Sequence, residues 1–256
     1  MAFSSGRLIR SSSNNECREG LPVRIALLGY GKMGKLVEMI ALREGWEIGI
    51  KLDMTDNPDG SGITRESMAG IDAAIEFSQP EAVLPNIEAT ARAGVNMVVG
   101  TTGWSDKRSE VERIVSESGI GLVYGANFSV GMNLFFEVVA HSARLIGMLP
   151  QYDAYLSEEH HRTKKDAPSG TALNILDLMR PHLASPNLSI ACVRAGSIPG
   201  THVVGFDSEA DTIILEHRAR NRQGFAEGAI MAARWIAGKK GLYDFRRVFR
   251  EIAGIK

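Results

Sequence analysis

The stretch that decides the fold is Pro22–Gly34, which reads PVRIALLGYGKMG. Its first half is a short run of branched apolar residues that ends at Gly29, and apolar residues then recur at helical spacing over 33–41. Gly29, Gly31 and Gly34 therefore form G-x-G-x-x-G between a strand and a helix. In this place the first glycine permits a tight turn, the second lets the backbone approach a pyrophosphate, and the third lets helix and strand pack closely. The stretch predicts a dinucleotide-binding turn.

A carboxylate at the end of the next strand-like run bears on the choice of nucleotide. Asp53 closes the segment EIGIKLD, roughly 20 residues beyond the glycine turn, where an acid hydrogen-bonds the adenine ribose. This carboxylate would repel a 2′-phosphate, whereas Lys32 and Lys51 could still accommodate one. Alternatively, Asp53 only caps a turn before Asp56 and Asn57. We expect NADH or NADPH as the cofactor, with NADH preferred.

The first half of the chain alternates strand-like and helical segments, which is typical of a parallel sheet with helices on both faces. Strands are expected over 22–28, 46–52, 73–77, 95–99 and 120–124, with helices over 33–41, 81–93 and 105–118. The pattern changes after Asn127. Helices are then expected over 130–147, 171–183 and 225–237, and strands over 152–158, 189–194, 201–206 and 211–219.

The last three of these strands alternate in polarity and are joined by turns rich in Gly, Pro and Asp, which favours an antiparallel sheet. The predicted fold class is α/β: a Rossmann-like, doubly wound parallel sheet with an inserted α+β domain that carries a mainly antiparallel sheet. We expect a flexible N-terminal extension over 1–20, a dinucleotide-binding domain over 21–128 plus 236–256, and a substrate-binding domain over 129–235.

The composition excludes several classes of protein. Among 256 residues, 29 Lys and Arg balance 30 Asp and Glu, so we expect no nucleic-acid partner. Two cysteines cannot build a disulfide framework. No run of apolar residues is long enough to span a membrane, and residues 1–20 lack the apolar core of a secretory signal. We expect a cytoplasmic protein without a membrane partner.

The most unusual segment is Glu158–Ala172, EEHHRTKKDAPSGTA, which holds two adjacent histidines and three cations ahead of a Ser-Gly-Thr helix start. Cations beside a helix N-terminus are suited to hold carboxylates or phosphates, and an imidazole among them exchanges protons near neutral pH. Adjacent residues on an extended chain point to opposite sides, and the zinc spacing H-E-x-x-H is absent. We therefore expect no metal. Isolated His202 and His217, on candidate strands, are expected to have packing or surface roles.

This segment resembles the signature of the dihydrodipicolinate reductase family, and the resemblance continues over nearly the whole chain from Val23. The other matching segments are Ile75–Ser78, Gly100–Trp104, Ala126–Gly131, Arg194–Gly200 and Phe225–Trp235. Leu28 and Met54 depart from the family pattern, at places where Gly and Arg are common. The second departure removes a partner for a 2′-phosphate.

The resemblance implies an activity, a site and an assembly. The activity is NAD(P)H-dependent reduction of 4-hydroxy-tetrahydrodipicolinate, a small cyclic dicarboxylate, to tetrahydrodipicolinate in diaminopimelate and lysine biosynthesis. The implied catalytic residues are His160 and Lys164, either of which donates the proton, and the substrate-binding residues are His161, Ser169, Gly170 and Thr171. The expected cofactor-binding residues are Gly29, Tyr30, Gly31, Lys32, Met33, Gly34, Asp53, Gly100, Thr101, Thr102, Ala126, Asn127 and Phe128. The inserted domain would assemble a homotetramer.

Two other functions fit parts of the pattern. A different nicotinamide-dependent imino- or amino-acid dehydrogenase would share the glycine turn. A non-catalytic dinucleotide-sensing protein would also bind the nucleotide, but it would not need the His and Lys side chains of the 158–172 segment.

Overall fold

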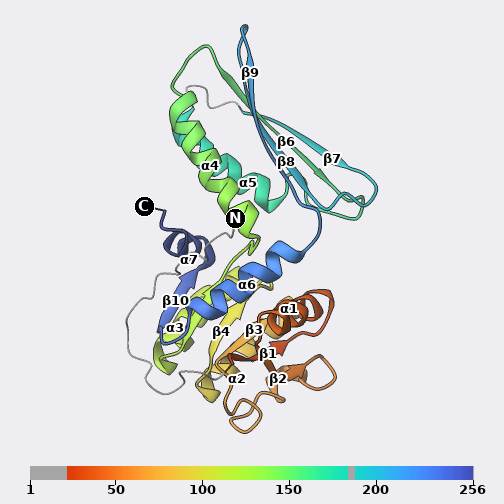
Figure 1. Cartoon of the computed structure of the whole chain (residues 1–256), viewed down its shortest axis with the longest axis vertical. Coiled ribbons are helices and arrows are strands. Elements are labelled where there is room, and N and C mark those ends of the chain that lie inside the picture. The colour runs from red at the N-terminus through yellow and green to blue at the C-terminus, as the bar shows by residue number, and fades with distance from the viewer. Residues whose placement is uncertain (1–21, 184–187, 256) are drawn as a thin grey trace, which may run out of the picture.

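The computed structural model describes residues 22–183 and 188–255, so the predicted extension over 1–20 lies outside the described residues. The described chain forms two bodies that each contain a sheet (Figure 1). The body drawn in the lower half holds a six-stranded parallel sheet, and the upper body holds a four-stranded sheet. The predicted fold class is confirmed.

The strands of the first sheet are β1 (Arg24–Leu28), β2 (Glu47–Leu52), β3 (Ala73–Glu76), β4 (Asn96–Val99), β5 (Gly121–Tyr124) and β10 (Gly241–Asp244). Their order is β10-β5-β4-β3-β1-β2, and every pairing is parallel. From β1 the chain runs first to β2 on one side and then crosses to β3 on the other. Because the loops that follow β1 and β3 diverge at this switch point, they leave a crevice for a ligand at the carboxyl edge.

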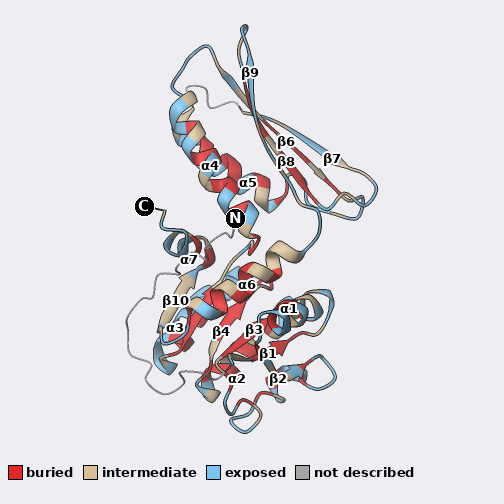
Figure 2. Ribbon diagram, in the orientation of Figure 1, coloured by how far each residue is buried: buried red, intermediate tan, exposed pale blue. Residues whose placement is uncertain are grey.

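Helices cover both faces of this sheet. They are α1 (Lys32–Arg43), α6 (Gln223–Trp235) and α7 (Phe245–Ile252) on one face and α2 (Pro80–Ala93) and α3 (Arg108–Ser118) on the other. Alternate residues of β1 serve the two layers: Ile25 and Leu27 pack with α1 and α6, whereas Ala26 and Leu28 pack with α2 and α3. Fully buried central strands are required for a parallel sheet of this kind, and β1, β3, β4 and β5 are largely red in Figure 2, whereas the edge strand β2 is mostly not.

The C-terminal segment carries more structure than we expected. Beyond the helix predicted over 225–237 we anticipated only a short tail, but the chain forms β10, which pairs with β5, and then α7. Helix α6, which we placed at the end of the second domain, packs on α1 and shares its buried core. Gly228 also lets α6 lie against the backbone of Phe128, because a Cβ there would lie 1.8 Å from the carbonyl oxygen of Phe128.

The second sheet contains β6 (Asp153–His160), β7 (Ser189–Arg194), β8 (Thr201–Asp207) and β9 (Thr212–Arg218), in the order β7-β6-β8-β9. The pairings of β6 with β8 and of β8 with β9 are antiparallel, but β7 pairs with β6 in parallel. Our expectation that β7 belongs to an antiparallel run was therefore wrong. The reason is that α5 (Gly170–Met179) and the turn after it return the chain to the start of β6, so β7 runs in the same direction.

One face of the second sheet is covered by α4 (Val130–Ile146) and α5, and the shared core includes Leu156, Val204 and Phe206 from the strands. The opposite face has no helical cover in Figure 1. Ser129 caps α4 by accepting a hydrogen bond from the amide of Met132. Within residues 22–183 and 188–255, no helix has both the length and the apolar character needed to cross a membrane.

Candidate active site

The glycine turn leaves its backbone exposed where a pyrophosphate would lie. Gly29 has φ +87°, and a Cβ there would lie 2.4 Å from the carbonyl oxygen of Phe77. A Cβ at Gly34 would lie 2.3 Å from the carbonyl oxygen of Gly29, whereas one at Gly31 would meet nothing within 4 Å. Gly31 is the N-cap of α1 and provides no side-chain hydrogen bond to the first amides. These open amides and their partial positive charge fit a diphosphate.

Asp53 lies beside this turn. The amide of Gly29 donates to the carbonyl oxygen of Leu52 at 2.8 Å, which brings the end of β2 against the end of β1. The Asp53 carboxylate is exposed and accepts the amide of Met54 at 2.9 Å, while its carbonyl oxygen accepts the amide of Asp56 at 3.0 Å. The turn that we weighed as an alternative is therefore present, and the carboxylate still has lone pairs for a ribose hydroxyl.

The two lysines near the glycine turn differ in their surroundings. The Lys51 ammonium is 2.8 Å from Glu38 and 4.8 Å from the centre of the Tyr30 ring, whose hydroxyl also donates to Glu38. Hydrogen bonds from Lys51 and Tyr30 lower the pKa of the Glu38 carboxyl, so it remains charged and compensates Lys51. Lys32, at the first position of α1, instead faces a large cavity described below.

The loops after β3 and β4 meet at the same edge of the sheet. A Cβ at Gly100 would lie 2.0 Å from the Phe77 ring, so only glycine fits against this ring. The Gly100 amide donates to the carbonyl oxygen of Glu76 at 2.9 Å, and the Trp104 indole donates to that of Thr101 at 2.8 Å. Thr101 is buried and Thr102 is exposed, so within this pair the exposed Thr102 side chain is the one free to reach a ligand.

Glu76 is a buried acid at the carboxyl end of β3. Its Oε1 accepts hydrogen bonds from the amide and the hydroxyl of Ser78, while Oε2 has no partner among the described residues. Burial raises the pKa of this carboxyl above its ordinary value, against the opposing effect of these hydrogen bonds. Burial therefore favours the protonated form of this carboxyl more than water does, and its hydrogen bonds to Ser78 fix the loop beside the predicted nicotinamide loop.

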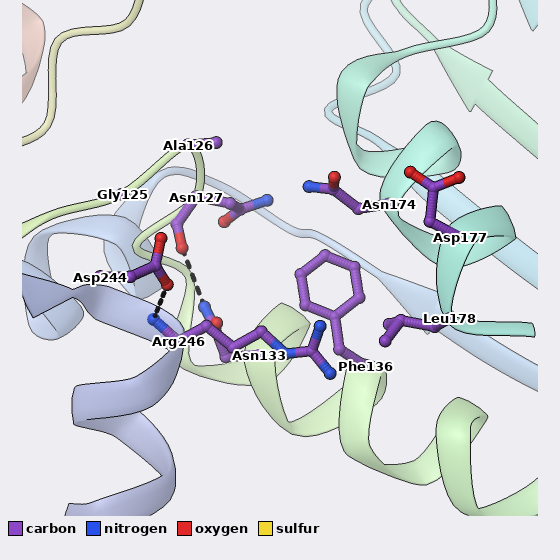
Figure 3. Close-up of a pocket in the computed structure, with 10 residues that line it drawn as sticks. All are labelled: Gly125, Ala126, Asn127, Asn133, Phe136, Asn174, Asp177, Leu178, Asp244 and Arg246. Carbon is purple, nitrogen blue, oxygen red and sulfur yellow. Dashed lines mark hydrogen bonds between the residues drawn. The ribbon is translucent and has the colours of Figure 1, made fainter. Parts of the chain in front are cut away.

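The segment Ala126–Phe128 links the two bodies. The Phe128 ring is buried against Phe245, with ring centres 4.4 Å apart, so a ligand could meet only its backbone. The side-chain amide of Asn127 donates to the Thr171 hydroxyl at 3.3 Å. The backbone carbonyl oxygen of Asn127 accepts a hydrogen bond from the side-chain amide of Asn133 at 2.9 Å. Figure 3 shows residues that line a small cavity on one side of this link, among them Asn127 and Asn133. This cavity of about 350 Å³ includes only Ala126 and Asn127 from the predicted site.

The segment that carries the family signature begins on a strand. His160 is the last residue of β6 rather than the first residue of a loop, and its side chain is largely buried. The Nδ1 of the neighbouring His161 lies 2.7 Å from the Thr163 hydroxyl. The Lys164 ammonium lies 2.7 and 3.0 Å from the two oxygens of Asp166. The hydrogen bond from Lys164 is the main cause that lowers the pKa of Asp166.

Glu158 is the centre of a buried polar network. One of its oxygens, Oε1, accepts hydrogen bonds from the Arg194 guanidinium and from the amide of Ser169 at 3.0 Å. Burial alone would raise the pKa of Glu158, but these hydrogen bonds outweigh it and lower the pKa to about 2. The Ser169 hydroxyl caps α5 by accepting the amide of Ala172 at 3.1 Å. Glu158 and Arg194, which also donates to the carbonyl oxygen of Asp166, thus join β6 and β7 to the loop before α5.

Two imidazoles face the second oxygen of Glu158. His160 Nε2 lies 3.5 Å and His202 Nε2 lies 3.6 Å from Oε2, which has no hydrogen-bond partner among the described residues. Burial lowers the pKa of both histidines, that of His202 to about 4, and the Lys164 charge acts in the same direction. Both imidazoles are therefore mainly neutral at pH 7 in the free protein.

One cavity of about 770 Å³ is lined by residues from both the predicted cofactor-binding site and the predicted substrate-binding site. Its lining combines the start of α1, the link and the start of α4, the turn after β6, and the ends of β8 and β9. The predicted site residues among its lining are Lys32, Asn127 and His161. His160 and Lys164 are absent from this lining, although His160 packs in a T-shaped contact against His202, which lines the cavity.

Four residues of this region were not predicted from the sequence as site residues: Glu76, Glu158, Arg194 and His202. We assigned His202 to packing, but it lies in the Glu158 network at 3.4 Å from the Ser169 hydroxyl. A usable signal was present for Glu158 and His160, because residues two apart on a strand share a face. Arg194 and His202 have no local signal, since strand pairing alone brings them to Glu158.

Fold and site together define a nicotinamide-dinucleotide-dependent oxidoreductase of two domains. Two family models match the chain: the dihydrodipicolinate reductase N-terminus over residues 23–128 and the C-terminus of the same family over residues 131–249. The chain belongs to the dihydrodipicolinate reductase family, and the resemblance found in the sequence is confirmed.

Curated relatives and a solved structure agree with the assignment to the dihydrodipicolinate reductase family. The 4-hydroxy-tetrahydrodipicolinate reductase of Christiangramia forsetii is 33% identical over 241 residues, which cover 90% of this chain and 99% of the relative. That of Cupriavidus necator is 34% identical over 264 residues, which cover 88% and 98%. The dipicolinate-bound dihydrodipicolinate reductase from Paenisporosarcina sp. TG-14 has the same fold, with a TM-score of 0.72 at 22% identity over 89% of this chain and 100% of that one.

Proposed function

We propose that this protein reduces 4-hydroxy-tetrahydrodipicolinate to tetrahydrodipicolinate with NADH or NADPH, in the pathway to diaminopimelate and lysine. The observation that carries the proposal is the 770 Å³ cavity, which the glycine helix shares with the turn that bears the family signature. A nucleotide on α1 and a dicarboxylate at that turn would face each other across it. Such proximity is a large part of what an enzyme contributes to a two-substrate reaction.

The cofactor would be held by backbone more than by side chains. The amides at the start of α1 would bind the pyrophosphate, and Asp53 would bind the adenine ribose. Thr102 and the link at Ala126–Asn127 would flank the nicotinamide, which supplies a hydride when bound. NADH is the proposed preference, because Asp53 is exposed beside the turn and Glu38 already compensates Lys51.

Cations and amides of the second domain would hold the substrate. Lys164 forms an ion pair with Asp166, which lies shortly before the start of α5. There the backbone amides of Gly170 and Thr171 have no carbonyl partner in a preceding helical turn. One substrate carboxylate would bind these amides in place of Asp166. His161 lines the 770 Å³ cavity, where it would lie close to the substrate. Positive charge there also stabilises the electron-rich enamine that forms as the ring is reduced.

Lys164 is the proposed proton donor. The Lys164 ammonium is held by Asp166 beside the start of α5, whereas the lowered pKa of His160 leaves that imidazole mainly neutral in the free protein. His160 would accept a hydrogen bond or orient water beside the ring until substrate charge favours its protonated form. The two carboxylates of the substrate would raise the pKa of His160, so the role of this residue depends on the bound state.

The proposal is tested by following the loss of nicotinamide absorbance when the purified chain meets freshly synthesised substrate. NADH and NADPH are compared under identical conditions. We expect turnover with both and a higher kcat/KM with NADH. Nucleotide binding without turnover would reject the proposal in favour of a dinucleotide-sensing protein, and turnover only with other imino acids would reject the substrate.

We also propose a cytoplasmic homotetramer. The open face of the second sheet carries exposed apolar side chains, among them Val193 and Ile214. Exposed apolar side chains grouped on one face are a common feature of interfaces. Light scattering of the purified chain should give the mass of four chains, and Ile214→Glu should reduce it. A monomer at micromolar concentration would contradict the assembly.

A further inference from the structure

The buried cluster Glu158, His160 and His202 has the ligand types and the geometry of a transition-metal site. One ligand atom from each residue lies within 4.8 Å of the other two. The Glu158 Oε2 to histidine Nε2 distances of 3.5 and 3.6 Å match the separation of about 3.4 Å between two ligands bound to a tetrahedral zinc ion at about 2.0–2.1 Å. All three side chains are buried.

Two of the three ligand atoms, Glu158 Oε2 and His160 Nε2, have no hydrogen-bond partner among the described residues. The third, His202 Nε2, has within those residues only the Ser169 hydroxyl at 3.4 Å, a contact that metal binding would replace. Glu158 uses its other oxygen, Oε1, for Arg194 and Ser169, so binding through Oε2 leaves that network in place. Unpaired buried polar atoms cost free energy, and a bound cation would remove that cost.

The neighbouring charges set the strength of such a site. Arg194 and Lys164 are positive and oppose a second cation, so tight structural binding is not expected. Two imidazoles and one carboxylate select Zn²⁺ and its neighbours in the transition series over Mg²⁺, which prefers oxygen ligands. The neutral imidazoles and the ionised carboxylate are also the forms that bind metals.

We propose that Glu158, His160 and His202 form an inhibitory site for Zn²⁺ with affinity in the micromolar range. The metal would occupy the ring nitrogen through which His160 faces Glu158 and fix this side chain against movement toward the substrate. Inhibition rests on the proposed reductase function, because it requires that His160 acts in turnover. Binding of the metal does not depend on that function.

The test begins with the metal-free full-length chain and Co²⁺, which reports its coordination in the visible spectrum. We expect one tetrahedral Co²⁺ per chain, displaced by Zn²⁺ and unaffected by Mg²⁺. Glu158→Gln and His202→Asn should each weaken binding at least about 10–100-fold. His217→Asn is the matched control: His217 lines the same cavity and packs against Phe135, and its removal should leave binding unchanged.

X-ray absorption of the Zn²⁺-bound wild-type chain gives a measurement that no folding defect of a variant can disturb. We expect nitrogen and oxygen ligands at about 2.0–2.1 Å and no sulfur at about 2.3 Å. Sulfur ligation would assign the metal to a cysteine such as Cys192, which is exposed on β7, and would overturn the proposal. Equal Co²⁺ affinity in His202→Asn and wild type, or an octahedral spectrum, would also overturn it.

The activity readout separates this inference from the proposed function. Zn²⁺ should inhibit the reductase reversibly, with recovery after EDTA, and Mg²⁺ should not inhibit. An inactive chain that still binds Co²⁺ through the three residues would reject the proposed function and support the site. An active chain that shows no tetrahedral Co²⁺ would support the function and reject the site.

Discussion

The glycine turn and the Glu158 network lie on the two sides of one enzyme and are built in opposite ways. The turn occupies six consecutive residues, Gly29–Gly34, and offers backbone amides. Its main requirement is therefore the absence of a side chain at its three glycine positions. The network offers side chains from β6, β7 and β8 and depends on the register of three strands. A site for a phosphate group therefore needs little more than local geometry, whereas a site for proton transfer needs the tertiary fold.

Removal of the Lys164 ammonium should have the largest effect. Lys164→Ala should lower kcat by about 10²–10⁴-fold if this group donates the proton, with little change in nucleotide affinity. Steady-state kinetics and fluorescence titration with NADH measure the two quantities. Lys165→Ala, the exposed neighbour, is the control and should retain wild-type kcat. A Lys164→Ala enzyme with normal kcat would assign the proton to another group.

Alanine in the glycine turn should separate stability from binding. Gly34→Ala forces a Cβ against the carbonyl oxygen of Gly29 and should destabilise the fold by about 1–3 kcal/mol. Gly31→Ala meets open space, so its unfolding free energy should stay within about 1 kcal/mol of wild type. Its NADH affinity should nevertheless fall about tenfold or more, because the methyl group occupies the place of the pyrophosphate. Urea unfolding measures the free energy of unfolding, and NADH titration measures the affinity. Normal NADH affinity in Gly31→Ala would refute the proposed binding of the pyrophosphate at this turn.

Asp166 should compete with the substrate for Lys164. Asp166→Asn removes an exposed ion pair worth about 0.2–1 kcal/mol. We therefore expect the substrate KM of Asp166→Asn to fall by about two- to five-fold at low salt. The kcat of this variant should differ from that of wild type by no more than the same factor. Initial rates at two salt concentrations check this, since the difference should shrink as salt rises. A raised KM would mean that Asp166 orients Lys164 rather than competing for it.

The buried Glu76 carboxyl should leave a mark on the pH dependence of stability. Its pKa is higher in the folded state than in the unfolded one, so the folded state binds the proton more tightly. The stability that this proton provides is complete below pH 4.5 and is lost as pH rises through the folded-state pKa. Glu76→Gln should therefore gain stability relative to wild type as pH increases. Urea unfolding between pH 5 and 8 measures the difference.

Glu81→Gln, an exposed carboxylate at the start of α2, is the matched control for that substitution. Its unfolding free energy should follow the wild type across the same pH range. If Glu76→Gln also follows the wild type, the pKa of the Glu76 carboxyl is not raised in the folded protein and the account of its burial is wrong.

The sequence predicted most of the first body because its signals are local. Apolar periodicity located β1 to β5, and the glycine spacing located the start of α1. β10 escaped because its four residues, Gly241–Asp244, have no alternation to detect and gain their strand conformation by pairing with β5. The parallel pairing of β7 with β6 also escaped, since register and direction depend on how α5 returns the chain.

The candidate site was predicted only as far as a continuous segment reaches. The signature over 158–172 placed His160 and Lys164 in one region, and the structure places both near Glu158 and Arg194. No spacing rule could have assigned His202, which reaches Glu158 because β8 pairs with β6. Side chains from distant strands are assembled by the fold, so they remain invisible until strand order is known.

The most direct test of the central claim is a crystal structure of the chain with NADH and pyridine-2,6-dicarboxylate, a planar analogue of the substrate. We predict the nicotinamide ring and the analogue on opposite sides of the 770 Å³ cavity, about 3–3.5 Å apart at the reacting atoms. We also predict an analogue carboxylate at Lys164 and the start of α5. An analogue bound away from Lys164, or a nucleotide away from the start of α1, would contradict the account.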